Sequence, residues 1–101
     1  MIHVTLDTDA DPIPLLMLQA ETWEVHIRAP LADLSRLSKI RTATWDDRRS
    51  IQAGTCGLSP VFWSITKDAQ ATILIGQDDE TWHTAFLIPL TAIDQIVTLT
   101  H

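Results

Sequence analysis

Three consecutive runs in the second half of the chain alternate apolar and polar residues: VFWSIT (61–66), ATILIG (71–76) and TWHTAFLI (81–88). A period of two is typical of β-strands, whose side chains point alternately to the two faces of a sheet. The separators KDAQ and QDDE are short and polar, as hairpin loops are. The pattern predicts a three-strand antiparallel meander over residues 61–88. One face would carry Val61, Trp63, Ile65, Ala71, Ile73, Ile75, Trp82, Thr84, Phe86 and Ile88.

The opposite face of this meander is more apolar than a fully solvated face needs to be, which indicates that something covers it. A helix is one candidate, because PLADLSRLSKI places leucines at every third position after a proline suited to a first helical turn. We therefore expect a short helix over residues 30–39. A second copy of the chain is the other candidate, and the protein would then be a homodimer. The apolar residues concerned are Phe62, Leu74, Ala85 and Leu87 of the sheet and Leu31, Leu34 and Leu37 of the helix.

The first half of the chain predicts further strands. The run TWEVHIR alternates, with Trp23, Val25 and Ile27 on its inward face, and IHVTL has the composition of an opening strand. The segments TATW and RRSIQAG flank Asp46 and Asp47 in the way that two strands flank a hairpin loop. We therefore expect another hairpin there.

Two segments fit either a helix or a strand, namely residues 14–21 and 91–99. The sequence contains no internal repeat and no Gly/Ser-rich linker, and 101 residues can bury one core. We expect a single domain over residues 1–101 in the α+β class. It would consist mainly of an antiparallel sheet of about five to six strands, with one or two short helices.

Charge is distributed unevenly along the chain. The net charge of −6 disfavours nucleic acid and anionic membranes as partners, because both are polyanions. Residues 28–49 hold six of the seven Lys and Arg residues against three aspartates, a balance of +3, whereas the two ends together carry ten carboxylates against Lys67, or −9. The fold could present a basic patch on an acidic body, or it could interleave these charges in space.

Cysteine content and hydropathy bear on the compartment. A single cysteine, Cys56, cannot form an internal disulfide, which agrees with a reducing compartment. No run of 18 apolar residues occurs, and the first residues lack the basic start and apolar middle of a secretory signal. We therefore expect a cytoplasmic protein that does not enter membranes.

The stretch DTDADPIP places Asp7, Asp9 and Asp11 at the first, third and fifth positions of a possible calcium loop. A loop of the helix-loop-helix type also needs glycine at the sixth position and glutamate at the twelfth. Those positions hold Pro12 and Leu18. We interpret the stretch as an acidic turn and expect no metal site.

Other candidate catalytic groups are isolated in the sequence. The histidines share no metal-ligand spacing with one another or with Cys56, which lies in AGTCGLSP and is more typical of a small buried residue than of a nucleophile. The acidic stretch 78–80 precedes His83, but a charged hairpin tip is the simpler interpretation. No phosphate-binding or dinucleotide-binding motif is present. We expect neither catalytic residues nor a cofactor. The histidines are His3, His26, His83 and His101.

The chain has four tryptophans and no tyrosine. Trp23, Trp63 and Trp82 each fall on an apolar strand face, which favours packing in the core. Trp45 differs, because a polar run precedes it and the charged residues DDRR follow it. A partly exposed tryptophan beside charges is typical of an anchor in a protein interface.

Two hypotheses follow for the function. The first is a non-enzymatic binding protein, such as a small inhibitor or immunity-type protein, that masks a basic surface of a protein partner. Its acidic residues would steer association and make the affinity depend on salt. The candidate contact residues are Trp45, Asp46, Asp47, Asp78, Asp79 and Glu80.

The alternative is a small-molecule-binding domain or small enzyme with an apolar pocket between the sheet and the helix over 30–39. Tryptophan and phenylalanine rings would line the pocket, and a histidine or an arginine would orient the ligand. The candidate residues are Trp23, Trp63, Trp82, Phe86, His83 and Arg28.

Overall fold

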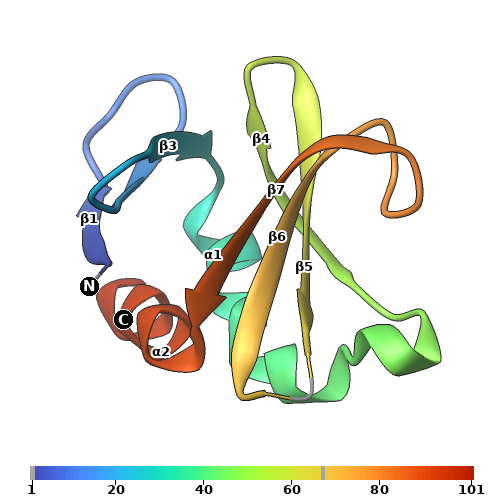
Figure 1. Cartoon of the computed structure of the whole chain (residues 1–101). Coiled ribbons are helices and arrows are strands. Elements are labelled where there is room, and N and C mark those ends of the chain that lie inside the picture. Colours follow the sequence, from blue (N-terminus) through green and yellow to red (C-terminus); the bar gives the residue numbers. More distant parts are fainter. Residues whose placement is uncertain (1, 67) are drawn as a thin grey trace.

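The computed structural model describes residues 2–66 and 68–101 and contains a seven-stranded antiparallel sheet (Figure 1). The strands follow one another across the sheet in chain order, so each strand pairs with its neighbours in sequence. The strands are β1 (His3–Asp7), β2 (Leu15–Gln19), β3 (Glu24–Arg28), β4 (Ile51–Cys56), β5 (Ser59–Ile65), β6 (Gln70–Gly76) and β7 (Trp82–Pro89). The helices are α1 (Leu31–Ser35) and α2 (Leu90–Leu99), with 3-10 segments η1 (Arg36–Thr42) and η2 (Trp45–Asp47).

The sheet opens into two halves around the helices, as Figure 1 shows. Strands β1 to β3 pair over five residues each, whereas β3 and β4 join through the pair Arg28 and Thr55. The long connection between β3 and β4 carries α1, η1 and η2. The helices of this connection therefore enter the space between the two halves and fill it with side chains.

The core consists of aliphatic side chains from the inner face of the sheet and from the helices. Leu34, Leu37 and Ile40 of the β3–β4 connection are fully buried, and so are Ile93 and Ile96 of α2. Each such side chain stabilises the fold by about 1.5–3 kcal/mol relative to exposure. The inner faces of the strands contribute Leu16, Leu18, Val25, Ile27, Val61, Trp63, Ile73 and Ile88 to the same cluster.

The predicted meander over residues 61–88 is confirmed. Trp63 of β5 lies opposite Ile73 of β6, which lies opposite Phe86 of β7. Trp63 is fully buried, and its indole Nε1 donates a hydrogen bond of 2.9 Å to the carbonyl of Ala53 in β4. This bond satisfies the one polar group of a ring that otherwise contributes apolar surface.

The α+β class is also confirmed, but the sheet has seven strands and not five to six. The additional strand comes from the ambiguous segment 14–21, which forms β2 because it lies between β1 and β3 and pairs with both. The other ambiguous segment, 91–99, is helical in α2. Its apolar residues Ala92, Ile93 and Ile96 recur on one side of the helix and are buried.

The predicted helix over 30–39 is present, but it changes form and covers a different face. It begins as α1 and continues as the 3-10 segment η1. Its Leu34 and Leu37 belong to the core cluster with Val61 and Trp63, on the inner face of the meander. The outer face, with Phe62 and Leu74, is left for other segments to cover.

The hairpin predicted around Asp46 and Asp47 is wrong. Residues 45–47 form the 3-10 turn η2, which is closed by hydrogen bonds from the backbone of Asp47 and Arg49 to the carbonyl of Thr44. Strand β4 begins later and pairs with β5. The alternation on both sides of the aspartates therefore does not correspond to two paired strands.

No helix in the described part of the chain is both long enough and apolar enough to cross a membrane.

A candidate protein-binding groove

A β-bulge between β6 and β7 places Trp82 on the outer face of the meander. Pairing is regular from Gln70 to Ile75, which lies opposite Thr84, but Gly76 then lies opposite Trp82. A Cβ atom on Gly76 would collide with the backbone of Trp82, so this strand approach needs glycine. The expected inward position of Trp82 is therefore wrong, and its side chain is 47% exposed.

Trp45 of η2 and Trp82 of β7 both line one hollow of about 170 Å3. The floor of the hollow is the outer face of β5 to β7. Leu87 lies opposite Thr72 in the sheet. It is 53% exposed and adds apolar surface beside the hollow. We call this feature the tryptophan groove. Its lining residues are Trp45, Ser64, Thr72, Leu74, Trp82 and Ala85.

The main chain of the β3–β4 connection holds Trp45 beside β5. Thr44 forms a parallel bridge with Ile65, whose backbone N–H donates a 3.0 Å hydrogen bond to the carbonyl of Ala43. The guanidinium of Arg48 lies 5.0 Å from the centre of the Trp45 ring. This cation–π contact covers part of the ring.

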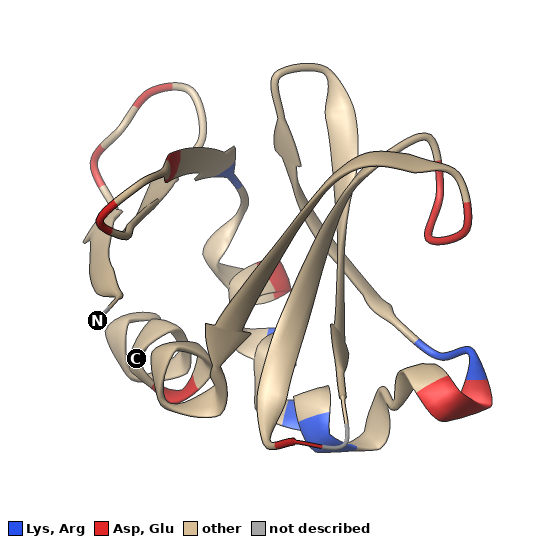
Figure 2. Cartoon of the chain, in the orientation of Figure 1, with Lys and Arg blue, Asp and Glu red and all other residues tan. Residues whose placement is uncertain are grey.

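Two acidic segments far apart in the sequence meet near the groove. Ser50, which follows η2, donates a 2.7 Å hydrogen bond to the carboxylate of Asp79 in the β6–β7 loop. Since β5 and β6 lie between β4 and β7 in the sheet, the loop must reach back across β5 to make this contact. Figure 2 shows the acidic loop and the acidic η2 turn on the same side of the molecule.

Local hydrogen bonds shape the acidic loop. The carboxylate of Asp78 accepts hydrogen bonds from the backbone N–H groups of Glu80, at 2.9 Å, and Thr81, at 2.6 Å. These two bonds favour the charged form and lower the pKa of Asp78 below its ordinary value. In the η2 turn, Thr44 donates a 2.8 Å hydrogen bond to Asp47. These bonds hold both carboxylates in position beside their own backbone segments.

We call the charged residues that follow Trp45 and those that precede Trp82 in the chain the acidic rim of the groove. Asp46, Asp47, Asp78, Asp79 and Glu80 carry five negative charges, and Arg48 and Arg49 carry two positive charges. The local excess of −3 has the same sign as the net charge of the chain. A basic group that approaches this side therefore meets an attractive field.

Ser64 is an unusual feature of the floor. It is 1% exposed, and its Oγ atom has no hydrogen-bond partner in residues 2–66 and 68–101. A buried hydroxyl without a partner destabilises the fold by about 1–3 kcal/mol. A donor or acceptor that entered the groove from outside would remove this penalty.

The aromatic residues proposed for an alternative pocket do not line one cavity. Trp63 is fully buried, and Trp23 packs against Phe86 with ring centres 4.5 Å apart. Trp82 lies on the other face of the sheet and belongs to the tryptophan groove. The space expected between sheet and helix is therefore filled by side chains at these rings.

The two polar residues proposed for that pocket make hydrogen bonds with different partners. The ring of His83 lies 3.5 Å from the hydroxyl of Ser59 and 3.0 Å from that of Thr84. Arg28 donates a 3.1 Å hydrogen bond to the carbonyl of Ile13 in the β1–β2 loop. The structure therefore assigns these two side chains to separate local contacts.

The acidic stretch after β1 is an exposed turn. The backbone N–H of Asp9 donates a 3.0 Å hydrogen bond to the carboxylate of Asp7. Among the described residues, no three His, Cys, Asp or Glu side chains gather as a metal site would require. Cys56 is a half-buried free thiol at the end of β4.

The sequence suggested Trp45 and the acidic segments as contact residues, but it did not indicate Ser64, Thr72 or the groove itself. The groove depends on the bulge at Gly76, which moves Trp82 to the face opposite to the one that its alternation indicates. The glycine before QDDET was the available signal, because glycine within a strand often marks a bulge.

Comparison with known proteins finds no matching family model, no matching curated protein and no matching solved structure.

Proposed function

We propose that the protein is a non-enzymatic binding protein that masks a basic surface of a protein partner through the tryptophan groove and its acidic rim. This is the mode of action of a small inhibitor or immunity-type protein. The observation that carries the proposal is the convergence of Trp45 and Trp82 over the buried, unpartnered hydroxyl of Ser64. The proposed setting is the cytoplasm, where the single thiol would stay reduced.

The groove has the two parts that a protein interface requires. Tryptophans are enriched among the residues that dominate binding energy, and they act best when charged or polar groups surround them and exclude water. Here the apolar floor and the two rings form the centre, and the carboxylates of Asp78, Asp79 and Glu80 form part of the rim. The rim would accelerate association with a basic partner and make it sensitive to salt.

A lysine or arginine side chain suits the groove best. Its aliphatic stem would pack between the rings, its cationic head would lie against the exposed face of Trp82, and an N–H group would donate to Ser64. Trp45 already holds the guanidinium of Arg48 at 5.0 Å, so a ring of this groove does accept a cation. The acidic rim compensates the added positive charge.

Site-specific photo-crosslinking tests the proposal. A photoreactive phenylalanine analogue in place of Trp82, expressed in the native host, should crosslink one basic protein. The same analogue in place of Leu58 is the control, because Leu58 is fully exposed in the β4–β5 turn and lies outside the groove. The crosslinked protein is then purified separately and recombined with the wild-type chain.

The recombined pair gives a quantitative result. Trp82→Ala should weaken the affinity at least about tenfold, as hot-spot tryptophans do. Asp79→Asn with Glu80→Gln should slow association, whereas Asp9→Asn with Asp11→Asn, an equal charge change outside the groove, should have a smaller effect. Crosslinking that is equal at positions 82 and 58, or an acidic partner, would contradict the proposal.

A further inference from the structure

We propose that two copies of this chain associate by antiparallel pairing of their β1 strands, so that the sheet continues from one copy into the other. The inference does not depend on the proposed function, because β1 lies on the opposite side of the molecule from η2 and the start of β7 (Figure 1), which supply Trp45 and Trp82 to the groove. β1 is one of the two outer strands of the sheet, and it pairs with β2 over all five of its residues. Among the described residues, residues 3–6 have no backbone hydrogen-bond partner outside that pairing, and at the end of the strand the N–H of Ala10 donates a 3.5 Å hydrogen bond to the carbonyl of Asp7.

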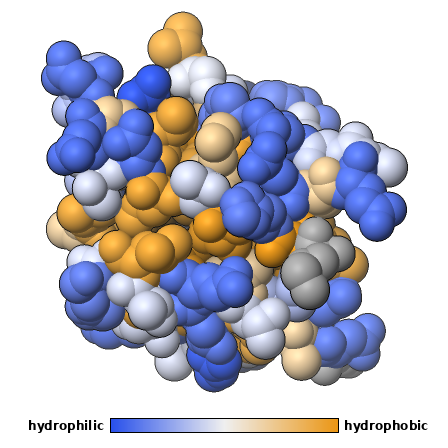
Figure 3. All heavy atoms as spheres, turned by 90° about the vertical axis from the view of Figure 1, so that its left-hand side faces the viewer, coloured by the Kyte–Doolittle hydropathy of each residue, from blue (hydrophilic) through white to orange (hydrophobic). Residues whose placement is uncertain are grey.

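Apolar surface remains uncovered beside this edge. Val4 and Leu6 of β1 are half-buried, although their cross-strand neighbours Leu18 and Leu16 are fully buried. Figure 3 shows the corresponding side of the molecule, where hydrophobic side chains gather in the middle of a polar border. The apolar side chains of β2 are thus completely buried, whereas those of the edge strand β1 are only partly buried. This is expected for an edge that is covered in the assembled protein.

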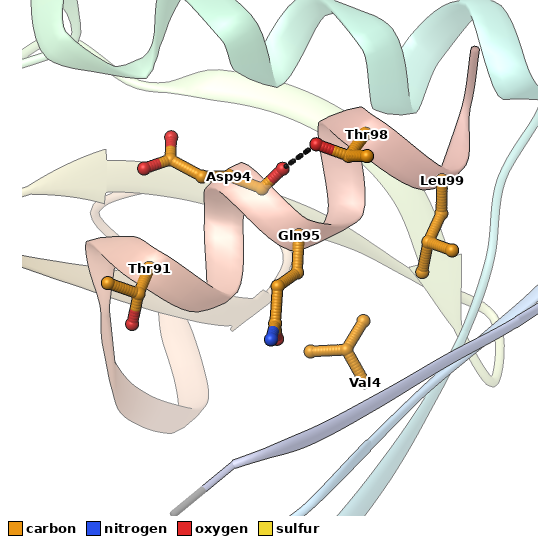
Figure 4. A pocket seen from close by; sticks show the side chains of 6 residues that line it. All are labelled: Val4, Thr91, Asp94, Gln95, Thr98 and Leu99. Carbon is orange, nitrogen blue, oxygen red and sulfur yellow. Dashed lines mark hydrogen bonds between the residues drawn. The ribbon is translucent and has the colours of Figure 1, made fainter.

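A groove of about 400 Å3 runs between β1 and α2. Figure 4 shows Gln95 and Leu99 of α2 directed toward Val4 of β1. Leu99 is 45% exposed. Part of the uncovered apolar surface therefore belongs to the helix, next to the strand edge that a partner strand would occupy.

The two outer strands differ in how they are protected. Proteins usually block exposed strand edges with lysine, proline, bulges or inward-pointing charges. β7, the opposite outer strand, has a bulge at Trp82 and ends at Pro89. The sequence of β1, HVTLD, contains no proline and no lysine, and its pairing with β2 is regular.

The sequence of β1 is complementary to itself when antiparallel. A two-fold axis perpendicular to the sheet keeps each side chain on its own face of the sheet. Two residues that lie opposite each other must therefore both have odd numbers or both have even numbers. Centring the pair on Thr5 gives the longest overlap. It places Val4 opposite Leu6 of the second copy on the inner face, and His3 opposite Asp7 of the second copy on the outer face. The first contact is apolar, and the second brings an imidazole to a carboxylate.

This complementarity identifies the occupant as a second copy of the chain. Each contact occurs twice, as an isologous interface requires. In the dimer, each copy would also cover the apolar groove beside the β1 strand of the other copy. A foreign strand would have to reproduce both the apolar pair and the imidazole–carboxylate pair, which the chain itself already supplies.

Sedimentation velocity of the wild-type protein and two lysine variants tests the inference. Wild type should sediment at twice the mass of one chain. Thr5→Lys should sediment as a monomer, because the axis would place two lysines against each other. The control Thr22→Lys adds the same charge in the exposed β2–β3 loop and should remain a dimer. A wild-type monomer up to about 1 mM, where even weak complexes are populated, or a dimeric Thr5→Lys, would overturn the proposal.

A crosslinking variant tests the register and remains informative if Thr5→Lys fails to fold. In a Cys56→Ser background, Thr5→Cys should form an intermolecular disulfide, because directly opposed residues have Cα atoms about 4.5–5.5 Å apart. Thr22→Cys in the same background should form none at equal concentration. Equal crosslinking of the two variants would contradict the proposed register.

Discussion

Ser50 donates a 2.7 Å hydrogen bond to the carboxylate of Asp79, a residue 29 positions later in the chain. This bond connects the segment that carries Trp45 with the loop that precedes Trp82. The two sides of the tryptophan groove are therefore linked by one polar contact as well as by the sheet beneath them. Loss of the contact should affect the groove more than the fold.

Ser50→Ala tests that link. Removal of the hydroxyl leaves a carboxylate that can still reach water, so the free energy of unfolding should fall by no more than about 1 kcal/mol. The β6–β7 loop should become more mobile, and amide hydrogen exchange at residues 77–81 should accelerate. Ser38→Ala, a matched change at an exposed position of η1, should leave exchange in this loop unchanged. Identical exchange in both variants would show that the bond does not order the loop.

Gly76 should tolerate alanine poorly. The added Cβ would collide with the backbone of Trp82, so the bulge would have to shift. We expect a loss of about 2 kcal/mol or more in stability, since a backbone shift costs at least as much as overpacking. Gly57→Ala is the comparison, because its Cβ meets nothing within 4 Å and the cost is limited to the left-handed backbone, about 1 kcal/mol. Urea denaturation measures both, and equal losses would argue against a tight bulge.

Trp63→Phe should destabilise the core. The substitution removes the donor to the carbonyl of Ala53 and leaves a void in a fully buried site, which together cost about 2–4 kcal/mol. Trp82→Phe, at a half-exposed site, should cost about 0.5 kcal/mol or less. The difference between the two denaturation midpoints checks the assignment of one ring to the core and the other to the groove.

Asp78 should make the acidic loop sensitive to low pH. Because backbone hydrogen bonds lower its pKa in the folded state, its contribution to stability is present above the ordinary pKa of an aspartate. That contribution is lost as the pH falls through the lowered folded value. Asp78→Asn should therefore reduce stability near neutral pH and have a smaller effect in acid. NMR titration of the Glu80 and Thr81 amides would follow the carboxylate directly, and a midpoint at or above the ordinary value would contradict this.

The sequence predicted those parts of the fold that follow directly from side-chain alternation. The paired strands of the β5–β7 meander, up to the bulge at Gly76, and the inward residues Val25 and Ile27 obey a period of two, and the structure confirms them. The η2 turn could not be recognised in this way. It is held by backbone bonds to Thr44, which leave no trace in the hydropathy pattern.

The candidate site was only partly predictable for a similar reason. The charge and aromatic content of the segments 45–47 and 78–80 marked them as surface features, and the structure places them on one side of the molecule. Trp82 was assigned to the core, because a bulge changes which face a residue occupies without altering the sequence pattern around it. Ser64 became notable only when its burial and its lack of a partner among the described residues were known.

The most direct test of the tryptophan groove is the dissociation constant of the recombined complex with wild type and with Ser64→Ala. The variant removes a buried hydroxyl that has no partner in the described part of the chain, so the free protein should be equally stable or more stable. If a partner group binds this hydroxyl, the affinity should nevertheless fall about fivefold to tenfold, the equivalent of one hydrogen bond. Unchanged affinity in a variant of unchanged stability would contradict the groove as the binding site.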